Sequence, residues 1–448
     1  MSSFTTPRGK GMAMSELILP RAKEQSAHWT EAMEVHWPGL TATLTRMIRI
    51  ASVSGNEAEL VGFVADWARD HKFQTDVFET TQKPPADIIG ASSASLPLQG
   101  RPTLVIRLPG RGGGRSLIFN AHSDVVAAPH PERWRFGGPW SGTMVDGRIY
   151  GRGACDAKGP LASGLLALLV LREVAPDGLP ADVWLELVPG EENCVGLGTW
   201  TSVVRGYHAA AAVILEPTDG LPRCASRGGL RFRISLSGQA IHGTVKWLGR
   251  DALAALRVVL DALGRMEAEF QWMEPDPFFA AYPLQRPITV DRVEGGTGQG
   301  MICDAASAEG YFELLPRDDL DVWKERFAQA LAGHGGKVNL RSDDIRVEFV
   351  EEYRGHITMP NHPLCQSAER IVTASEAGAA WAGWSAFNSG CEAALRWRLD
   401  STPTVIWGPG HLTQAHAVDE FVELASVRET ARQLALLAWD WTQPKESD

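Results

Sequence analysis

The sequence lacks the features of several protein classes. Its six cysteines stand apart, with no Cys-x-x-Cys pair among them, so we predict neither a zinc knuckle nor a disulfide framework. It has no surplus of basic residues, since 43 Lys and Arg against 54 Asp and Glu give a formal net charge of −11. That balance opposes non-specific neutralisation of nucleic-acid phosphates. Nucleic acid is therefore not an expected partner.

Long hydrophobic runs are also absent. The longest apolar stretch, residues 161–171, is too short to cross a bilayer, which takes about 20 residues. We predict a buried helix there. Residues 1–23 carry charges but no continuous apolar core of the kind that a secretory signal needs. Together with scattered cysteines that we expect to be reduced, these features favour a cytoplasmic protein that does not bind membranes.

Several catalytic motifs are missing as well. Gly151 and Gly153 open an expected helix, but position 156 is Asp where a dinucleotide fingerprint needs Gly. The chain has no Gly-Lys-Ser/Thr of a P-loop, no His-Glu-x-x-His and no Gly-x-Ser-x-Gly. The sequence therefore excludes the common nucleotide-binding, zincin and serine-hydrolase motifs.

The order of expected helices and strands indicates the fold. A chain of 448 residues is long enough for two or three domains. Apolar positions at helical spacing predict helices within residues 38–70, interrupted at 52–56. Expected strands at 103–108, 116–121, 183–188 and 212–215 then alternate with helices, one of which begins near Lys158. This alternation predicts an α/β domain with a largely parallel sheet.

The pattern changes between residues 226 and 351. Strand, helix, strand, strand, helix and strand are expected, in this order, at 229–237, 249–266, 288–293, 308–314, 320–332 and 345–350. This is the order of a ferredoxin-like α+β unit. A helix at 363–376, a strand at 404–407 and a helix at 424–441 resume the first domain. We therefore predict an N-terminal extension (1–25), a catalytic domain (26–225 and 352–448) and an inserted domain (226–351).

Polar residues of one chemical kind follow the expected strands of the first domain. They are His or carboxylates, namely His122, Glu191, Glu192, Glu216 and His416. Ligands of an open α/β sheet lie just outside the carboxyl ends of its strands, so four strands deliver these residues to one edge. Asp156 lies just before a helix whose N-terminal dipole favours an anion. The sequence thus predicts a site for divalent cations at this edge.

The residue types narrow the chemistry. Two His and three carboxylates suit zinc, cobalt or manganese better than calcium or magnesium. Asp124, two residues beyond His122, can accept the other imidazole N–H and so orient the ring. Neighbours in extended chain point opposite ways, so one of Glu191 and Glu192 can face a metal while the other faces a bound water as general base. Each residue alone could be a structural His, a surface Glu or a helix cap; their convergence favours the metal site.

Five segments in a fixed order carry a family resemblance. They read Phe-Asn-Ala-His-Ser-Asp (119–124), Arg-Gly-Ala-Cys-Asp-Ala-Lys-Gly (152–159), Pro-Gly-Glu-Glu-Asn (189–193), Leu-Glu-Pro-Thr (215–218) and Gln-Ala-His-Ala-Val-Asp-Glu (414–420). In this order they resemble the M20 metallopeptidase family, which includes acetylornithine deacetylases, succinyl-diaminopimelate desuccinylases and glutamate carboxypeptidases. The resemblance runs from Pro38 to the C-terminal helix, and residues 390–416 look most like the acetylornithine deacetylase branch.

The resemblance implies two divalent metal ions, with zinc first and cobalt or manganese as alternatives. By the family pattern one ion would be held by His122, Asp156 and Glu216. The other would be held by Asp156, Glu192 and His416, with Asp156 bridging the two. The ligand set therefore spans the whole first domain.

The same resemblance implies catalytic roles for three further residues. Glu191 would be the general base, and Asp124 would orient His122. His242, in Ser-Gly-Gln-Ala-Ile-His-Gly (237–243), would reach the active site of a partner subunit and stabilise the oxyanion there. The inserted domain would then be a lid through which the chain forms a homodimer.

The lid segment departs from the family pattern at two places. Gly-Met-Ile-Cys (300–303) stands where Asn-x-x-Pro is usual, and Glu313 stands where the lid usually places an Arg three residues before a Pro. An Arg fork binds a substrate carboxylate, whereas Glu would repel one. Three other arginines could take the role of the lid Arg: Arg227, Arg250 and Arg317.

The expected function is hydrolysis of an amide C–N bond in a small N-acylated amino acid or a related compound. A dipeptidase or carboxypeptidase with the same machinery is the first alternative, and an aromatic-amine amidohydrolase or deaminase is the second. A non-catalytic binding protein on the same scaffold is the alternative of a different class. The loss of Glu191 or of a ligand would indicate such a binding protein, but all six of these positions are present.

Overall fold

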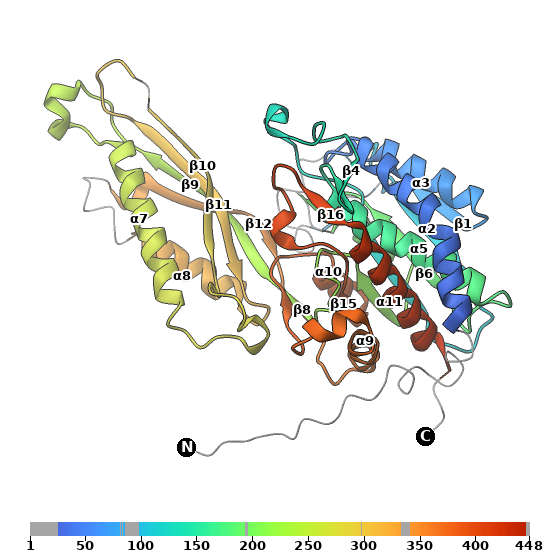
Figure 1. Cartoon of the computed structure of the whole chain (residues 1–448). Helices are drawn as coiled ribbons and strands as arrows, with labels where there is room; N and C mark the ends of the chain where they lie inside the picture. The colour runs from blue at the N-terminus through green and yellow to red at the C-terminus, as the bar shows by residue number, and fades with distance from the viewer. Residues whose placement is uncertain are drawn as a thin grey trace.

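The computed structural model describes residues 26–444, apart from 81, 83, 86–97, 193–195, 297 and 333–340. The expected N-terminal extension, Cys194 and His334 thus lie outside the described residues. Two bodies lie side by side, and the chain crosses between them at β8–β9 and again at β12–β13 (Figure 1). Each body has its own apolar core, and the core of the inserted body is drawn from residues 230–349.

The catalytic body is built on a six-stranded sheet. Its strand order is β1 (Gln74–Phe78), β2 (Thr103–Leu108), β6 (Val183–Val188), β3 (Leu117–His122), β7 (Ala211–Ile214) and β15 (Thr404–Ile406). The neighbours β6, β3, β7 and β15 pair in parallel, whereas β2 is antiparallel to both β1 and β6. The predicted parallel arrangement thus holds for the four strands that carry the expected ligands, and their carboxyl ends meet at one edge.

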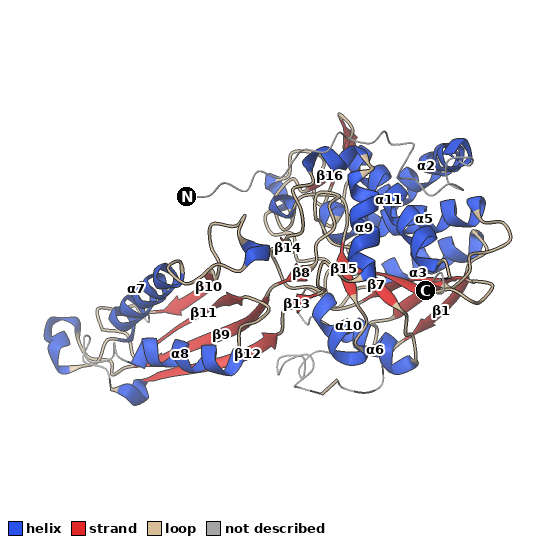
Figure 2. Ribbon diagram, turned by 90° about the horizontal axis from the view of Figure 1, so that it is seen from below, coloured by secondary structure: helices blue, strands red, loops and turns tan. Residues whose placement is uncertain are grey.

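Helices cover both faces of this sheet, as Figure 2 shows. One face carries α2 (Ser26–Arg49), α3 (Ala58–Asp70), α5 (Gly159–Val174), α9 (Pro363–Thr373) and α11 (Leu424–Thr442). The other face carries α6 (Leu197–Arg205) and α10 (Ala393–Asp400). The α/β class and the layered architecture predicted from the alternation of elements are confirmed.

The apolar stretch at 161–171 lies inside α5, at the centre of the core. Among the described residues, one helical segment, Ala154–Val174, is long and apolar enough to cross a membrane, and 94% of its apolar stretch is buried inside the protein. It packs against α2 and α11. The prediction of a buried helix is therefore confirmed.

Helix α2 differs from its expected start. It begins at Ser26 instead of Pro38, and Pro38 lies inside it on the exposed side. Buried side chains recur at helical spacing on both sides of Pro38, including Trp29, Met33 and Leu40. Packing of this apolar stripe outweighs the backbone hydrogen bond that the proline cannot donate.

The inserted body has the predicted order of elements. They are β9 (Gly228–Ser237), α7 (Ala252–Phe270), β10 (Ile288–Gly295), β11 (Ala305–Leu314), α8 (Leu320–Ala332) and β12 (Ile345–Tyr353). The strands form one antiparallel sheet in the order β10-β11-β9-β12, which is ferredoxin-like. Helix α7 begins three residues later than expected because the Asp251 carboxylate accepts hydrogen bonds from Leu253 N and Ala254 N.

The two faces of this lid sheet differ in chemistry. Leu230, Phe232 and Ile234 alternate inward and are buried under α7 and α8. Because side chains alternate along a strand, positions 229, 231 and 233 face the opposite side of the sheet. Among the described residues of the lid, both long helices, α7 and α8, pack on the buried face, and that side is left uncovered by them.

Short strands complete the fold. The strands β8 (Ala225–Ser226), β13 (His356–Ile357) and β14 (Ala386–Phe387) form one small sheet at the junction of the two bodies. The strands β4 (Thr143–Val145), β5 (Arg148–Tyr150) and β16 (Phe421–Glu423) form another beside α11. The five described cysteines are free and buried.

Candidate metal centre

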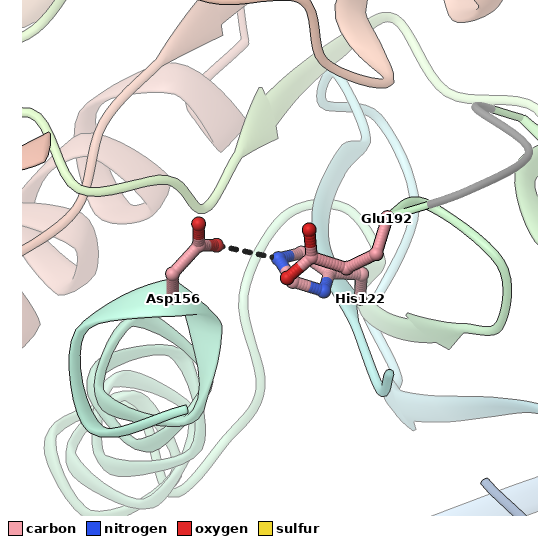
Figure 3. Close-up of side chains that lie close together, drawn as sticks. All are labelled: His122, Asp156 and Glu192. Atoms are coloured by element: carbon pink, nitrogen blue, oxygen red, sulfur yellow. Dashed lines mark hydrogen bonds and ion pairs between the residues drawn. The ribbon is translucent and has the colours of Figure 1, made fainter. Parts of the chain in front are cut away.

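Three predicted ligands lie within reach of a single ion. The ligand atoms of His122, Asp156 and Glu192 lie within 4.8 Å of one another (Figure 3). His122 is the last residue of β3, and Asp156 lies in the short turn Ala154–Lys158 ahead of α5. Glu192 follows β6. The parallel register of β3 and β6 therefore brings residues 70 positions apart to one point.

Asp156 faces two histidines with two different oxygens. His122 Nε2 lies 2.9 Å from Asp156 Oδ1, and His416 Nε2 lies 3.5 Å from Asp156 Oδ2. His416 Nε2 also lies 3.0 Å from Glu192 Oε2. A carboxylate whose two oxygens face separate sets of ligands has the arrangement that a bridging ligand needs.

Glu216 and Glu191 lie in the same buried region. Glu216 lies two residues beyond the end of β7 and is 4% exposed. A Cβ added at Gly408 would lie 2.3 Å from the Glu216 carbonyl oxygen. Only glycine lets the chain that follows β15 pass this close, and this passage brings the loop carrying His416 to the site.

The cluster holds more negative charge than its own residues neutralise. Burial, together with neighbouring carboxylates, raises the pKa of Glu191 and of Glu216 well above the usual range, and that of Glu192 less strongly. Burial lowers the pKa of His122, but the hydrogen bond with Asp156 and the field of Glu216 outweigh this and raise it well above normal. Bound divalent cations would neutralise this excess negative charge, so the carboxylates and the neutral imidazole would be favoured as ligands.

The donor atoms fit such cations. Within the described part of the chain, Glu192 Oε1 is buried without a hydrogen-bond partner. A metal ion would supply the partner that this oxygen lacks. His122 Nδ1 donates to the Asp124 carbonyl oxygen at 2.9 Å, so Nε2 is the nitrogen that faces the carboxylates. The set of imidazole nitrogens and carboxylate oxygens suits zinc, cobalt or manganese.

Asp124 contacts His122 through its backbone and not, as predicted, through its side chain. Its carboxylate lies 3.8 Å from His122 Nδ1, and it is the main-chain carbonyl that accepts the imidazole N–H. The carboxylate instead accepts the backbone N–H groups of Gly190, Glu191 and Glu192 at 2.9, 3.1 and 3.2 Å. Asp124 therefore orients the ring through its backbone and holds the two glutamates through its side chain.

A buried ion pair that the sequence analysis missed ties two ligand segments together. Glu420 Oε1 accepts the backbone N–H of Cys155 and of Asp156 at 2.9 and 3.1 Å. Glu420 Oε2 accepts from Arg152 at 2.6 Å, and Arg152 also donates to the His416 carbonyl oxygen at 3.2 Å. Both residues lie in the quoted segments 152–159 and 414–420, but nothing local marks them as partners.

Replacing Glu420 with Gln is expected to weaken metal binding by about 10- to 100-fold, the usual effect of losing a residue that supports metal ligands. Gln keeps the shape but leaves the buried Arg152 guanidinium without its counter-charge. Competition with a chromogenic chelator measures the affinity. Glu423→Gln is the matched control, because Glu423 pairs with Arg148 on the surface. Equal metal affinity in the Glu420 variant and the wild type would show that Glu420 does not support the metal ligands.

His242 does not join the cluster. It is exposed in the lid, where its Nδ1 lies 2.8 Å from Thr244 Oγ1 and its backbone pairs with Met301. The single chain therefore brings together His122, Asp156, Glu192 and His416, with Glu191 and Glu216 beside them. The role of His242 in a partner's site stays a prediction.

A cavity of about 420 Å³ separates the cluster from the bare face of the lid sheet. Glu191, Glu192 and His416 line it from the catalytic side. The lid contributes six side chains: Arg231, Asp291, Tyr311, Glu313, Glu351 and Tyr353. The cavity places the expected general base and the lid residue Glu313 around one small volume.

None of the three arginines considered as substitutes for the lid Arg is among these lining residues. Arg227 is buried and donates to Asn388 and to the Gln285 carbonyl oxygen. The other two pair with acidic residues, Arg250 with Asp344 and Arg317 with Asp276. Arg231, which the sequence analysis did not consider, is the one arginine among the described lining residues.

Known proteins resemble this chain along most of its length. The family model described as peptidase family M20/M25/M40 matches residues 118–440. An N-formyl-4-amino-5-aminomethyl-2-methylpyrimidine deformylase of Bacillus subtilis is 27% identical over 384 residues, which cover 78% of this chain and 84% of the relative. An acetylornithine deacetylase of Shigella sonnei is 24% identical over 395 residues, 86% of this chain and 93% of the relative.

Solved structures share the fold. A dipeptidase from Saccharomyces cerevisiae superposes with a TM-score of 0.73 at 14% identity, covering 97% of this chain and all of that one (100%). A Bacillus subtilis protein described as a dinuclear metal-binding peptidase superposes with a TM-score of 0.59 at 16% identity, covering 92% and 98% of the two chains. The fold of this chain is therefore one that known peptidases share.

Proposed function

The chain belongs to peptidase family M20/M25/M40 and is a hydrolase of amide C–N bonds; within that activity, we propose that it removes a small acyl group from the nitrogen of a small amine. The predicted reaction type and family are thus confirmed. The acyl group, the amine and the residue roles given below are proposals.

One observation carries the proposal: the general-base candidate Glu191 and two proposed ligands, Glu192 and His416, line a cavity of about 420 Å³ that lid residues line from the other side. Pockets for small molecules occupy roughly 300–1,000 Å³, so the volume suits a small amide better than a folded protein. Similarity to a deformylase and to a deacetylase supports the same choice, since both names describe removal of a small acyl group.

His122, Asp156 and Glu216 would hold one divalent ion, and Asp156, Glu192 and His416 the other. When bound, such ions lower the pKa of a coordinated water towards neutrality and polarise the substrate carbonyl. Glu191 would take a proton from the attacking water and later give it to the departing nitrogen. The Asp124 carboxylate holds Glu191 in place through its backbone N–H. Water adds across the amide, and the products are a carboxylic acid and an amine.

We extend the proposal to the metal, the assembly and the compartment. Zinc is the first choice because the donors are imidazole nitrogen and carboxylate oxygen. A homodimer through the lid is supported by Trp247 and Leu248, which are 69% and 65% exposed beside His242. The buried, free cysteines suit a reducing compartment such as the cytoplasm.

The metal dependence of amide hydrolysis tests the proposed function. Protein stripped with a chelator should cleave no N-formyl, N-acetyl or dipeptide substrate, and zinc, cobalt or manganese should restore cleavage of at least one N-acyl amine. Released amine is measured by a fluorogenic amine reagent. Cleavage of dipeptides alone would favour a dipeptidase, and no metal-dependent cleavage of any amide would refute the proposal.

A further inference from the structure

The lid wall of the cavity contains a side-chain pair that spans three strands. Glu313 of β11 and Tyr353 of β12 both lie opposite Gly229 of the central strand β9. Across this position the Tyr353 hydroxyl donates to Glu313 Oε2 at 2.7 Å. Both residues line the cavity that contains Glu191. The pair is thus aimed at the space where a substrate of the proposed reaction would lie.

Two glycines make room for this pair. A Cβ at Gly229 would lie 2.5 Å from the Tyr353 hydroxyl oxygen, and a Cβ at Gly390 would lie 2.7 Å from Tyr353 Cε2. Both distances are too short for real contacts, so any larger residue at either position would displace the ring. The Tyr353 ring is therefore held from both sides, and through it the Glu313 carboxylate is held in one place.

Glu313 has acceptor capacity to spare. Tyr353 bonds only to Oε2, and among the described residues no other side chain donates to this carboxylate. Burial raises the pKa of Glu313, while the Tyr353 hydrogen bond and the charge of Arg227 oppose that shift. A carboxylate that is half-buried and only partly satisfied is stabilised by a ligand that brings a positive charge.

Three of the four charged side chains that line the lid wall are acidic, including Glu313. Asp291 and Glu351 also line the cavity, against Arg231 as the one guanidinium among its described lining residues. Arg231 donates to the Tyr311 hydroxyl at 2.6 Å and lies 3.5 Å from Glu309 and 4.0 Å from Asp291, so its charge is already balanced within the lid. The lid wall therefore favours a cation and repels an anion.

Building on the proposed function, we propose that Glu313, positioned by Tyr353, determines substrate specificity by binding a basic nitrogen group on the amine half of the substrate. The ligand class is an N-acylated amine that carries an ammonium or amidine-type group and no carboxylate. The basic group donates to the Glu313 carboxylate while the amide carbonyl lies at the metal cluster. Hydrolysis then breaks only the amide C–N bond.

A matched series of substrates tests this assignment on the full-length, zinc-loaded protein. N-acetyl-1,3-diaminopropane, N-butylacetamide and N-acetyl-4-aminobutanoate share one acetamide and differ in a terminal cation, methyl group or anion. We expect the wild type to prefer the cation over the neutral compound by about tenfold or more in kcat/KM, mainly through KM. The anion should be the poorest of the three.

Variants separate the role of Glu313 from general effects. Glu313→Gln should bring the cation-to-neutral ratio towards one, and Glu313→Arg should reverse the order so that the anion is preferred. Tyr353→Phe should raise KM for the cation less than Glu313→Gln does, because it removes only the positioning hydrogen bond. Glu294→Gln is the matched control, since Glu294 carries the same charge in the same sheet but pairs with Arg292 on the surface.

The outcomes distinguish the two proposals. If the protein cleaves none of the three amides, nor the formyl and dipeptide panel, the proposed function fails. If it cleaves amides but prefers the anion, or if Glu313→Gln and Glu313→Arg keep the wild-type order, the assignment of Glu313 is overturned while the proposed function stands. The Arg variant keeps the test decisive if Glu313→Gln folds poorly, because only a binding role reverses the preference.

Discussion

Glu191→Gln is expected to lower kcat by about 10³-fold or more while the protein keeps its metal ions. The size follows from the usual contribution of general acid–base catalysis, about 10²–10⁴-fold. Gln occupies the same space and leaves the backbone N–H of residue 191 on the Asp124 carboxylate, but it cannot take a proton from water. Because the change removes a role made only in the transition state, KM should change little.

Metal content decides how this result is interpreted. Elemental analysis of the Glu191→Gln protein should give the same metal-to-protein ratio as the wild type. A variant that kept more than a tenth of the wild-type kcat with full metal content would falsify the role of Glu191 as general base. A variant that lost metal together with activity would place Glu191 among the ligands instead.

Asp156→Asn is expected to abolish activity by removing metal from both sites. The two oxygens of Asp156 face different histidines, His122 at 2.9 Å and His416 at 3.5 Å. Asn replaces a carboxylate, whose two oxygens share one negative charge, with an amide that has one neutral oxygen. The two ions would therefore lose the ligand that they share. We expect metal content to fall from about two ions per chain to well below one after gel filtration.

Glu216→Gln, which changes a ligand proposed for one ion only, is the matched comparison for Asp156→Asn. Glu216 is assigned to the His122 side, since His122 is the charged neighbour that acts most strongly on the Glu216 carboxyl. Glu216→Gln should therefore weaken one ion more than the other and leave about one ion per chain. Two retained ions in Asp156→Asn would show that this carboxylate does not bridge. Thermal unfolding of each variant in chelator provides the folding control.

Much of the site could be read from single segments of the chain. His122, Glu191, Glu192, Glu216 and His416 each follow an apolar strand, and the strand ends of a parallel sheet meet at one edge. The structure places His122, Glu192 and His416 around Asp156 accordingly. The order of strands and helices in the lid could also be predicted, because alternating apolar positions such as Leu230, Phe232 and Ile234 mark the buried face of a strand.

The contacts of buried polar side chains could not be predicted, because their partners are distant in sequence. The carboxylate of Asp124 binds a loop 66 residues away, and Glu420 lies 264 residues from the Asp156 N–H that it accepts. Arg227 was considered as a substrate ligand, yet it is engaged by Asn388. No local pattern states which of several chemically suitable partners a buried polar group will meet.

The sequence by itself determined the elements, the class of fold and the types of residue that gather at the strand ends. Local apolar spacing and turn chemistry are enough for that, since both act within a few residues. Only the tertiary structure decided that Tyr353 crosses Gly229 to reach Glu313, and that Arg231 is already engaged by Tyr311. Strand register and the packing of the lid against the catalytic body set those contacts, and through them the sign of the charge that the cavity favours.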